Sequence, residues 1–224
     1  MHFFDDPHRF NQGIEFYAKR FHHCTEDTDN KHKQIILDAT PNYLNQAKNV
    51  HKVYTDTRAG DAIIKLKLIV ILREPIDREL SWYNHKLSMY NSGLRDHWIT
   101  DVTYHNGTIK SFDQYTSSLA KEIRKDPRKS FSLYVDHLKT WVELFDRRHL
   151  LLLSYDEMLK NPSKFQSRIE SFLGITLHGD FVYSNTNEFQ TKVRKIPDYA
   201  IRVLEPLFDA KNSEVRYLLF SKPL

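Results

Sequence analysis

An unbroken apolar run, residues 68–72, constrains this chain most, because Arg73, Glu74 and Pro75 follow it directly. A continuous apolar run, rather than an alternating one, is typical of a parallel strand that is buried on both faces. Pro75 presets the backbone φ at the first position of a helix, where its missing N–H is not needed. The sequence therefore predicts a strand over residues 65–72 and a helix over residues 75–90. Arg73 then lies at the carboxyl end of a central strand, the edge at which open α/β sheets bind their ligands.

Arg73 and Ser81 carry side chains that can hold one phosphate group between them. The arginine offers a planar fork of N–H donors, and Ser81, about two helical turns into the predicted helix, adds a hydroxyl donor. This pairing predicts a nucleotide-using transferase. The alternative is an ordinary buried strand and a solvated helix, in which Arg73 pairs with Glu74 or Asp77.

The rest of the chain predicts an α/β layered sheet in a single domain, residues 1–224. Strand-like runs at residues 34–37, 65–72 and 149–154 alternate with helical stretches, which favours parallel strands with helices on their faces. Helices are expected at residues 12–20, 45–55, 75–90, 112–123, 131–145, 162–173 and 197–208. The mostly polar residues 91–110 are expected to form a long loop. With 224 residues and 40% hydrophobic content, the chain can bury a sizeable core.

The charge balance favours an anionic partner. The net charge is +4 and the pI is near 9.0, which suits a polyanionic substrate or an anionic donor. Nucleic acid is not expected, because the basic residues are interspersed with 29 acidic ones and no helix-turn-helix, zinc-finger or RNA-binding signature occurs.

Cysteine and hydropathy patterns exclude further classes. Cys24 is the only cysteine, so no internal disulfide can form. His22, His23 and His32 lie near it, but their spacing matches no zinc pattern, and no metal site is expected. No apolar stretch approaches the roughly 20 residues that a membrane helix needs, so no membrane segment is expected in this chain.

Several ordered segments resemble one enzyme family. The strand, Arg73 and Ser81 resemble the 3′-phosphate-binding motif of sulfotransferases that use 3′-phosphoadenosine 5′-phosphosulfate, in which an arginine at the strand end precedes a serine by eight residues. The start of the chain resembles the heparan-sulfate-type members, which carry a His-Phe-Phe-Asp element and then a Gly-x-x-x-Tyr helix. Here these are residues 2–5 and 13–17. Further matches to the family lie at residues 37–44, 134–145, 150–159 and 161–175.

The resemblance implies a fold, a reaction and site residues. The expected fold is a three-layer, P-loop NTPase-like parallel sheet, and the expected reaction transfers a sulfuryl group to a hydroxyl or amine of a glycan, in the Golgi lumen. Arg73 and Ser81 would bind the 3′-phosphate of the donor. Lys192 and Arg194 resemble a late Lys-x-Arg loop that closes over the nucleotide, although an exposed charge run is the alternative. His2 and Asp5 match acceptor-side positions, with an N-terminal cap and surface pair as the alternative.

The chain also departs from the family pattern. Its glycines are isolated, so the Lys-containing, Gly-rich loop that binds the 5′-phosphosulfate is missing. The family's glutamate base lies just before the His-Phe-Phe-Asp element, which places the expected base upstream of Met1 and leaves the catalytic residue unknown. Ala39 stands where the family usually has a lysine. We therefore expect an N-terminally truncated copy without the first strand. A non-catalytic glycan- or nucleotide-binding module and a P-loop kinase-like fragment remain the alternatives.

Overall fold

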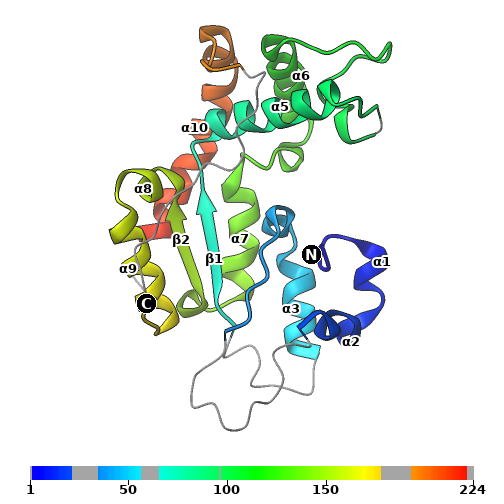
Figure 1. The fold of residues 1–224 in the computed structure, drawn as a ribbon. Coiled ribbons are helices and arrows are strands. Elements are labelled where there is room, and N and C mark those ends of the chain that lie inside the picture. The colour runs from blue at the N-terminus through cyan, green and yellow to red at the C-terminus, as the bar shows by residue number, and fades with distance from the viewer. Residues whose placement is uncertain (1, 22–34, 57–65, 96, 178–192, 221–224) are drawn as a thin grey trace.

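The computed structural model describes residues 2–21, 35–56, 66–95, 97–177 and 193–220 (Figure 1). Within these residues the sheet consists of two strands, β1 (Leu68–Leu72) and β2 (Leu150–Ser154). The strands run parallel, with Leu68 opposite Leu150 and Leu72 opposite Ser154. Parallel strands need a long crossover connection, which helices supply here. The predicted α/β class with a parallel sheet is confirmed.

Helices cover both faces of the β1–β2 pair, as a doubly buried strand requires. One face packs against α7 (Tyr134–Leu144) and α10 (Asp198–Phe220), and its strand residues are Val70, Leu72 and Leu152. The other face packs against α8 (Tyr155–Lys160) and α9 (Pro162–Leu173), and its strand residues are Ile69, Leu151 and Leu153. The alternation along each strand therefore builds three layers, which explains why both runs are continuously apolar, although Ile71 of β1 remains 47% exposed.

The remaining elements form two groups around this sheet, visible in Figure 1. The N-terminal group consists of α1 (Pro7–Phe10), α2 (Gly13–Ala18), η1 (Lys19–Phe21), η2 (Pro41–Asn45) and α3 (Ala47–Asp56). The second group consists of α5 (Pro75–Asn91), η3 (His97–Ile99), α6 (Phe112–Lys125) and η4 (Pro127–Lys129), while η5 (Arg147–His149) directly precedes β2. The N-terminal group packs through a core of aromatic residues around Phe3, Phe4 and Trp141.

The start of α5 follows the local rules that predicted it. Pro75 is the first residue of the helix, and the Glu74 side chain caps it by accepting a hydrogen bond from the Asp77 N–H at 2.7 Å. The capping carboxylate also suits the positive end of the helix dipole. Glu74 is thus occupied by the helix backbone.

The predicted strand at residues 34–37 is wrong for its described part. Residue 34 lies outside the described residues, and residues 35–37 form no strand. Ile35, Ile36 and Leu37 expose 45%, 53% and 78% of their surface. A strand needs a neighbour for its backbone hydrogen bonds, and no described segment pairs with this one. Sequence shows the β propensity of a segment but not whether a partner edge is present.

The structure differs from the prediction at one loop and at the end of one helix. The sequence predicts a long loop over residues 91–110, yet Ile99 and Val102 are buried there, and Thr103 and Ile109 form an antiparallel bridge. Single apolar residues among polar ones anchor this segment to the core. The helix expected to end at residue 208 continues to Phe220, because Val215 on its last turns packs against α7. The other predicted helices lie within a few residues of the observed ones.

A buried carboxylate joins three parts of the fold. Glu79 on α5 is 2% exposed and forms an ion pair with Arg78 at 2.9 Å. Tyr115 on α6 donates its hydroxyl to the second carboxylate oxygen at 2.6 Å. Ser132, just before α7, donates to the first at 2.5 Å. Both oxygens of the Glu79 carboxylate are therefore hydrogen-bonded, which a buried charge needs in order to be stable. Burial and the nearby Glu79 charge raise the pKa of Tyr115, so its phenol remains a donor.

Replacing Glu79 with alanine should lower the free energy of unfolding by about 2–4 kcal/mol, because Arg78, Tyr115 and Ser132 would lose a shared buried acceptor. Glu79→Gln should lose less, since an amide oxygen can still accept from the hydroxyls. Urea unfolding followed by circular dichroism measures both. Glu122→Ala, which removes a half-exposed carboxylate from surface lysines, should be nearly neutral. Equal losses at Glu79 and Glu122 would contradict the role given to Glu79.

Tyr134 ties the start of α7 to the end of β1. Its hydroxyl donates to the Arg73 carbonyl oxygen at 2.9 Å, and the residue is 6% exposed. Burial raises the pKa of Tyr134 to about 12, with the charge of Arg78 opposing the shift. The phenol therefore stays protonated and holds Arg73 in place across the neutral range.

The raised pKa of Tyr134 predicts alkaline sensitivity. The unfolded chain ionises this tyrosine near pH 10 and the folded chain near pH 12, so stability is constant below pH 10 and falls as the pH rises toward 12. We expect Tyr134 to account for about 2–3 kcal/mol of that fall. Unfolding measured from pH 8 to 11.5 should show a shallower decline for Tyr134→Phe. Identical slopes for both proteins would show that Tyr134 does not carry the effect.

Candidate functional site

Arg73 lies where the two strands end together. Because Leu72 is opposite Ser154, the next residues, Arg73 and Tyr155, leave the same edge of the sheet side by side. The guanidinium of Arg73 lies 5.0 Å from the centre of the Tyr155 ring, over its face. A cation stacked on an aromatic ring is oriented but keeps its N–H donors. Arg73 is half-buried at the carboxyl end of β1, as the sequence predicts.

Ser81 stands on α5, half-buried, on the helix that Arg73 introduces. Among the described residues, neither the Ser81 hydroxyl nor the Arg73 guanidinium forms a hydrogen bond with another side chain or with the backbone. The alternative pairing of Arg73 with Glu74 or Asp77 is not found in this part of the chain, since Glu74 caps α5. The β1–α5 junction thus presents guanidinium and hydroxyl donors that form no hydrogen bond within the described residues.

Arg78 is a third polar group on this stretch, to which the sequence pattern assigned no role. It precedes Ser81 by three residues and so shares a face of α5 with it, a spacing that could have identified it. Its guanidinium is bound to Glu79 and lies 5.5 Å from the centre of the Phe131 ring and 5.7 Å from that of Trp82. The Arg78 guanidinium is therefore held in a fixed position near Ser81, where it is paired with the Glu79 carboxylate.

The described end of the predicted basic loop, which begins at Val193, is attached to α5. Lys192 lies outside the described residues, and Arg194 is exposed. Val193, between them, forms two hydrogen bonds with the buried side chain of Asn84: its N–H donates at 2.8 Å and its carbonyl accepts at 3.0 Å. Asn84 is one helical turn beyond Ser81, so the structure brings Arg194 to the same helix as Ser81.

His2 and Asp5 form a pair at the N-terminal side. The His2 Nδ1 lies 2.8 Å from Asp5 Oδ2, and the side chains are 51% and 8% exposed. His2 has a positive φ of 55°, a strained conformation for a residue other than glycine. The second Asp5 oxygen is buried with no hydrogen-bond partner among the described residues. Buried polar atoms are usually hydrogen-bonded, so this Asp5 oxygen is an acceptor that the described fold leaves unused.

Asp38 lies in the same N-terminal region, and its carboxylate accepts hydrogen bonds from three side chains. Its carboxylate accepts hydrogen bonds from Tyr17 at 3.1 Å, Tyr43 at 3.0 Å and Thr40 at 3.4 Å. Burial, followed by the charge of Asp38, raises the pKa of Tyr17, so the phenol stays a donor. Tyr43 also accepts from the Phe3 N–H at 2.9 Å. Asp38 thus acts as a structural anchor for the residues next to His2.

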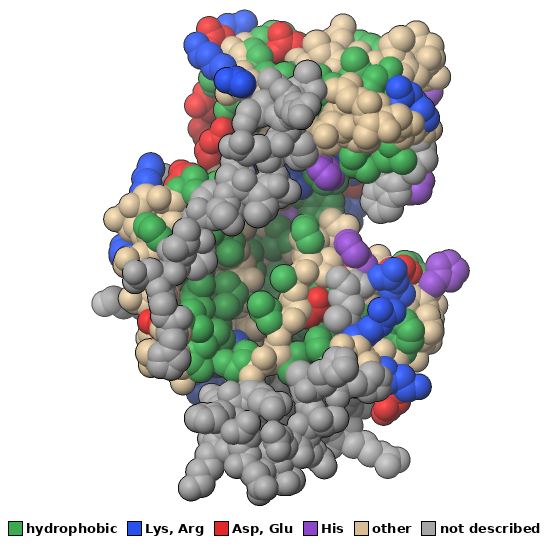
Figure 2. Space-filling model, in the orientation of Figure 1, with side chains coloured by type: hydrophobic (Ala, Val, Ile, Leu, Met, Phe, Trp, Pro, Cys, Tyr) green, Lys and Arg blue, Asp and Glu red, His purple; other side chains and the backbone are tan. Residues whose placement is uncertain are grey.

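A hollow separates the part of the molecule that contains α5 and α6 from the part that contains α1 to α3 (Figure 2). Figure 2 shows hydrophobic side chains in its floor. Among the described residues, Ile35, Ile36, Leu37 and Ile71 are exposed apolar side chains. In the described residues no group of three or more metal-ligating side chains occurs, and no helix is long and apolar enough to cross a membrane. Cys24 and the histidines near it lie outside those residues.

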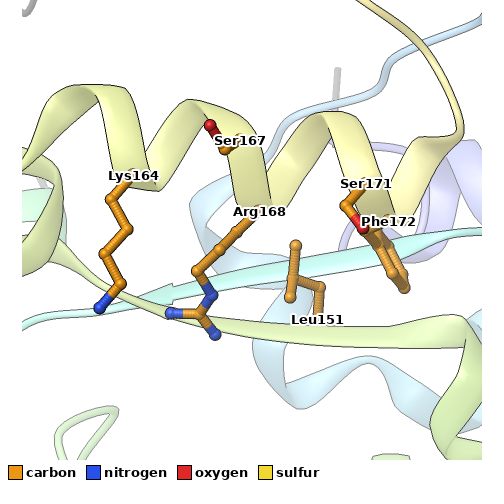
Figure 3. A pocket seen from close by; sticks show the side chains of 6 residues that line it. All are labelled: Leu151, Lys164, Ser167, Arg168, Ser171 and Phe172. Atoms are coloured by element: carbon orange, nitrogen blue, oxygen red, sulfur yellow. The ribbon is translucent and has the colours of Figure 1, made fainter.

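A second depression, between α9 and β2, is not a ligand-site candidate (Figure 3). Figure 3 shows Lys164 and Arg168 extending from α9 toward the strand. Both cations are already paired with Glu157, at 3.0 Å and 2.5 Å. Arg168 also donates to the Leu152 carbonyl at 3.0 Å, which covers the outer edge of β2.

Comparison with known proteins agrees with the motifs. Residues 2–197 match the sulfotransferase domain family. Bifunctional heparan sulfate N-deacetylase/N-sulfotransferase 4 of Mus musculus is 24% identical over 182 residues, which is 80% of this chain and 18% of that protein. Heparan sulfate glucosamine 3-O-sulfotransferase 5 of Homo sapiens is 22% identical over 175 residues, which is 78% of this chain and 44% of that protein. The chain thus spans less than half of either relative.

Among solved structures, a sulfotransferase from Alicyclobacillus acidocaldarius is 20% identical, with a TM-score of 0.49. The match covers 81% of this chain and 63% of that one. The resemblance read from the segments around Arg73 and Ser81 is confirmed by the family match, which extends over most of the sequence. This chain belongs to the sulfotransferase family.

Proposed function

We propose that this chain binds 3′-phosphoadenosine 5′-phosphosulfate at the β1–α5 junction and takes part in sulfuryl transfer to a hydroxyl or amine of a glycan. One observation carries the proposal: Arg73, at the carboxyl end of the parallel strand β1, and Ser81, on the helix that follows, have side chains with no hydrogen-bond partner among the described residues. A guanidinium and a hydroxyl match the acceptor oxygens of a phosphate. By the same family resemblance, we place the reaction in the Golgi lumen.

On the donor side, Arg73 would bind the 3′-phosphate with its N–H fork. The Tyr155 ring beneath the guanidinium and the Tyr134 hydroxyl on its backbone carbonyl hold this residue from two sides. Ser81 would add a third donor, while Arg78 stays paired with Glu79 and helps to hold α5 in shape. Lys192 and Arg194 would close over the nucleotide, as the Lys-x-Arg resemblance suggests.

On the acceptor side, His2 and Asp5 would contact the glycan. Asp5 at 2.8 Å favours the proton on His2 Nδ1, which leaves Nε2 as an acceptor for a sugar hydroxyl. In the transfer step, the acceptor oxygen or nitrogen forms a bond to sulfur while the bond from sulfur to the 5′-phosphate oxygen breaks. Adenosine 3′,5′-bisphosphate leaves, and the acceptor proton passes to a base. The protein supplies positioning and charge.

The charge and the relatives support a polyanionic acceptor. A net charge of +4 attracts polyanionic chains at long range. Two of the relatives carry heparan sulfate in their names. We therefore propose a sulfated or carboxylated glycan as the acceptor class.

The donor proposal predicts selective nucleotide binding. Adenosine 3′,5′-bisphosphate should bind more tightly than adenosine 5′-monophosphate, because only the former offers a 3′-phosphate to Arg73. Arg73→Ala should cost about 2–4 kcal/mol of that binding, since it removes a charge-assisted bidentate contact. Titration calorimetry measures both affinities.

Arg148→Ala is the matched control, because that arginine precedes β2 at the opposite end of the sheet and pairs with Asp146. It should leave nucleotide binding unchanged. Equal affinity for the two nucleotides would refute the 3′-phosphate site. Tight binding of ATP with magnesium, unaffected by Arg73→Ala, would favour a kinase-like module instead.

The acceptor proposal predicts a separate loss. His2→Ala and Asp5→Asn should each weaken heparan sulfate binding about tenfold, while the affinity for adenosine 3′,5′-bisphosphate stays constant. His8→Ala, an exposed histidine on α1, serves as the control. Surface plasmon resonance on immobilised heparan sulfate gives the comparison. If all three variants bind glycan equally well, the His2–Asp5 pair is only a cap on the N-terminus.

A further inference from the structure

Asn84 makes an unusual connection between helix and loop. Its side chain, on α5, is 6% exposed, and it bonds both backbone polar groups of Val193, a residue 109 positions later in the chain. The amide oxygen accepts from the Val193 N–H at 2.8 Å, and the amide nitrogen donates to the Val193 carbonyl at 3.0 Å. Asn84 thus pairs with Val193 as a neighbouring strand would.

Such a pair fixes the backbone at Val193 firmly. A buried amide left without partners is costly, so both hydrogen bonds are strongly favoured once the side chain is covered. Apolar packing reinforces them: Val193 and Ile196 lie against the core cluster that contains Leu80 and Tyr83 of α5. The segment that starts at Val193 is therefore seated on α5 before it enters α10.

The contact between Asn84 and Val193 lies next to the candidate donor site. Asn84 follows Ser81 by three residues, so their side chains are on adjacent turns of one face of α5, about 5–6 Å apart at Cβ. Arg194 directly follows the residue that Asn84 holds. Asn84 therefore determines where the exposed Arg194 side chain begins relative to Ser81.

We propose that Asn84 is a positioning residue for the donor site, which places Arg194 within reach of the phosphate held by Arg73 and Ser81. This inference rests on the proposed function, since it assumes nucleotide at the β1–α5 junction. Asn84 itself would touch no ligand, because both of its polar atoms are bound to Val193. Its effect on affinity would pass through Arg194.

A double-mutant cycle separates this role from simple stabilisation. Asn84→Leu, Arg194→Ala and the double variant of the whole chain are titrated with adenosine 3′,5′-bisphosphate by calorimetry. Each single substitution should weaken binding about five- to tenfold. The double variant should bind no more weakly than Arg194→Ala alone, because Asn84 acts through Arg194. Asn84→Asp keeps an acceptor for the Val193 N–H and should lie between wild type and Asn84→Leu.

Asn49→Leu is the matched control, since Asn49 also donates to a backbone carbonyl, that of Phe4, but in the N-terminal part of the fold. It should leave nucleotide affinity unchanged. If Asn84→Leu does not fold, Asn84→Asp takes its place in the same cycle.

Three results would overturn the inference. Losses that multiply in the double variant would mean that Asn84 and Arg194 act independently, and unchanged affinity in Asn84→Leu would mean that the pair is structural alone. Both leave the proposed function intact if Arg73→Ala still weakens binding. If the wild-type chain fails to distinguish adenosine 3′,5′-bisphosphate from adenosine 5′-monophosphate, the proposed function falls and this inference falls with it.

Discussion

The buried carboxylate of Glu79 is the interaction on which the geometry of the candidate site depends. A charge at 2% exposure must be fully hydrogen-bonded, and its partners come from α6, from the segment before α7 and from Arg78 beside it. The two partners outside α5, Tyr115 and Ser132, restrain the rotation of the helix about its axis. Because Ser81 lies within one helical turn of Glu79, its orientation follows from that anchor. The helix is held again by Asn84 one turn later.

Two arginines near Glu79 have different roles, because only one of them is paired with its carboxylate. Arg78 neutralises Glu79 and is packed near Phe131 and Trp82, so its charge is committed to the fold. Arg73 is stacked on Tyr155 and held through its own carbonyl by Tyr134, while its N–H donors form no hydrogen bond within the described residues. A preorganised cation with unused donors is what anion binding requires, because little entropy remains to be lost on binding. The fold thus orients the guanidinium of Arg73 and leaves its N–H donors without a hydrogen-bond partner among the described residues.

Local chemistry explains which parts the sequence could predict. The continuous run before Arg73 and the proline after it determine strand and helix within a few residues, and those predictions hold for β1 and α5. The strand predicted at residues 34–37 does not hold for Ile35 to Leu37, because pairing depends on a neighbour that no local pattern reveals. The partners of Glu79 and Asn84 could not be predicted either, since Tyr115 and Val193 are 36 and 109 residues away along the chain. Nothing in the local pattern marks a buried polar residue as a long-range anchor.

Helix α7 connects the two sides of the candidate site. At its first residue, Tyr134 holds the Arg73 carbonyl, and two turns later Trp141 donates its indole N–H to the Leu44 carbonyl at 2.7 Å. Leu44 belongs to η2, whose Tyr43 bonds the Phe3 N–H beside His2. Arg73 and the N-terminal pair are therefore fixed to one helix, whose two contact points lie about 10 Å apart along the helix axis. The proposed in-line transfer would require donor and acceptor at a constant separation, since small displacements of reacting atoms are costly. A single helix that carries both attachments would meet that requirement without direct contact between the two sides.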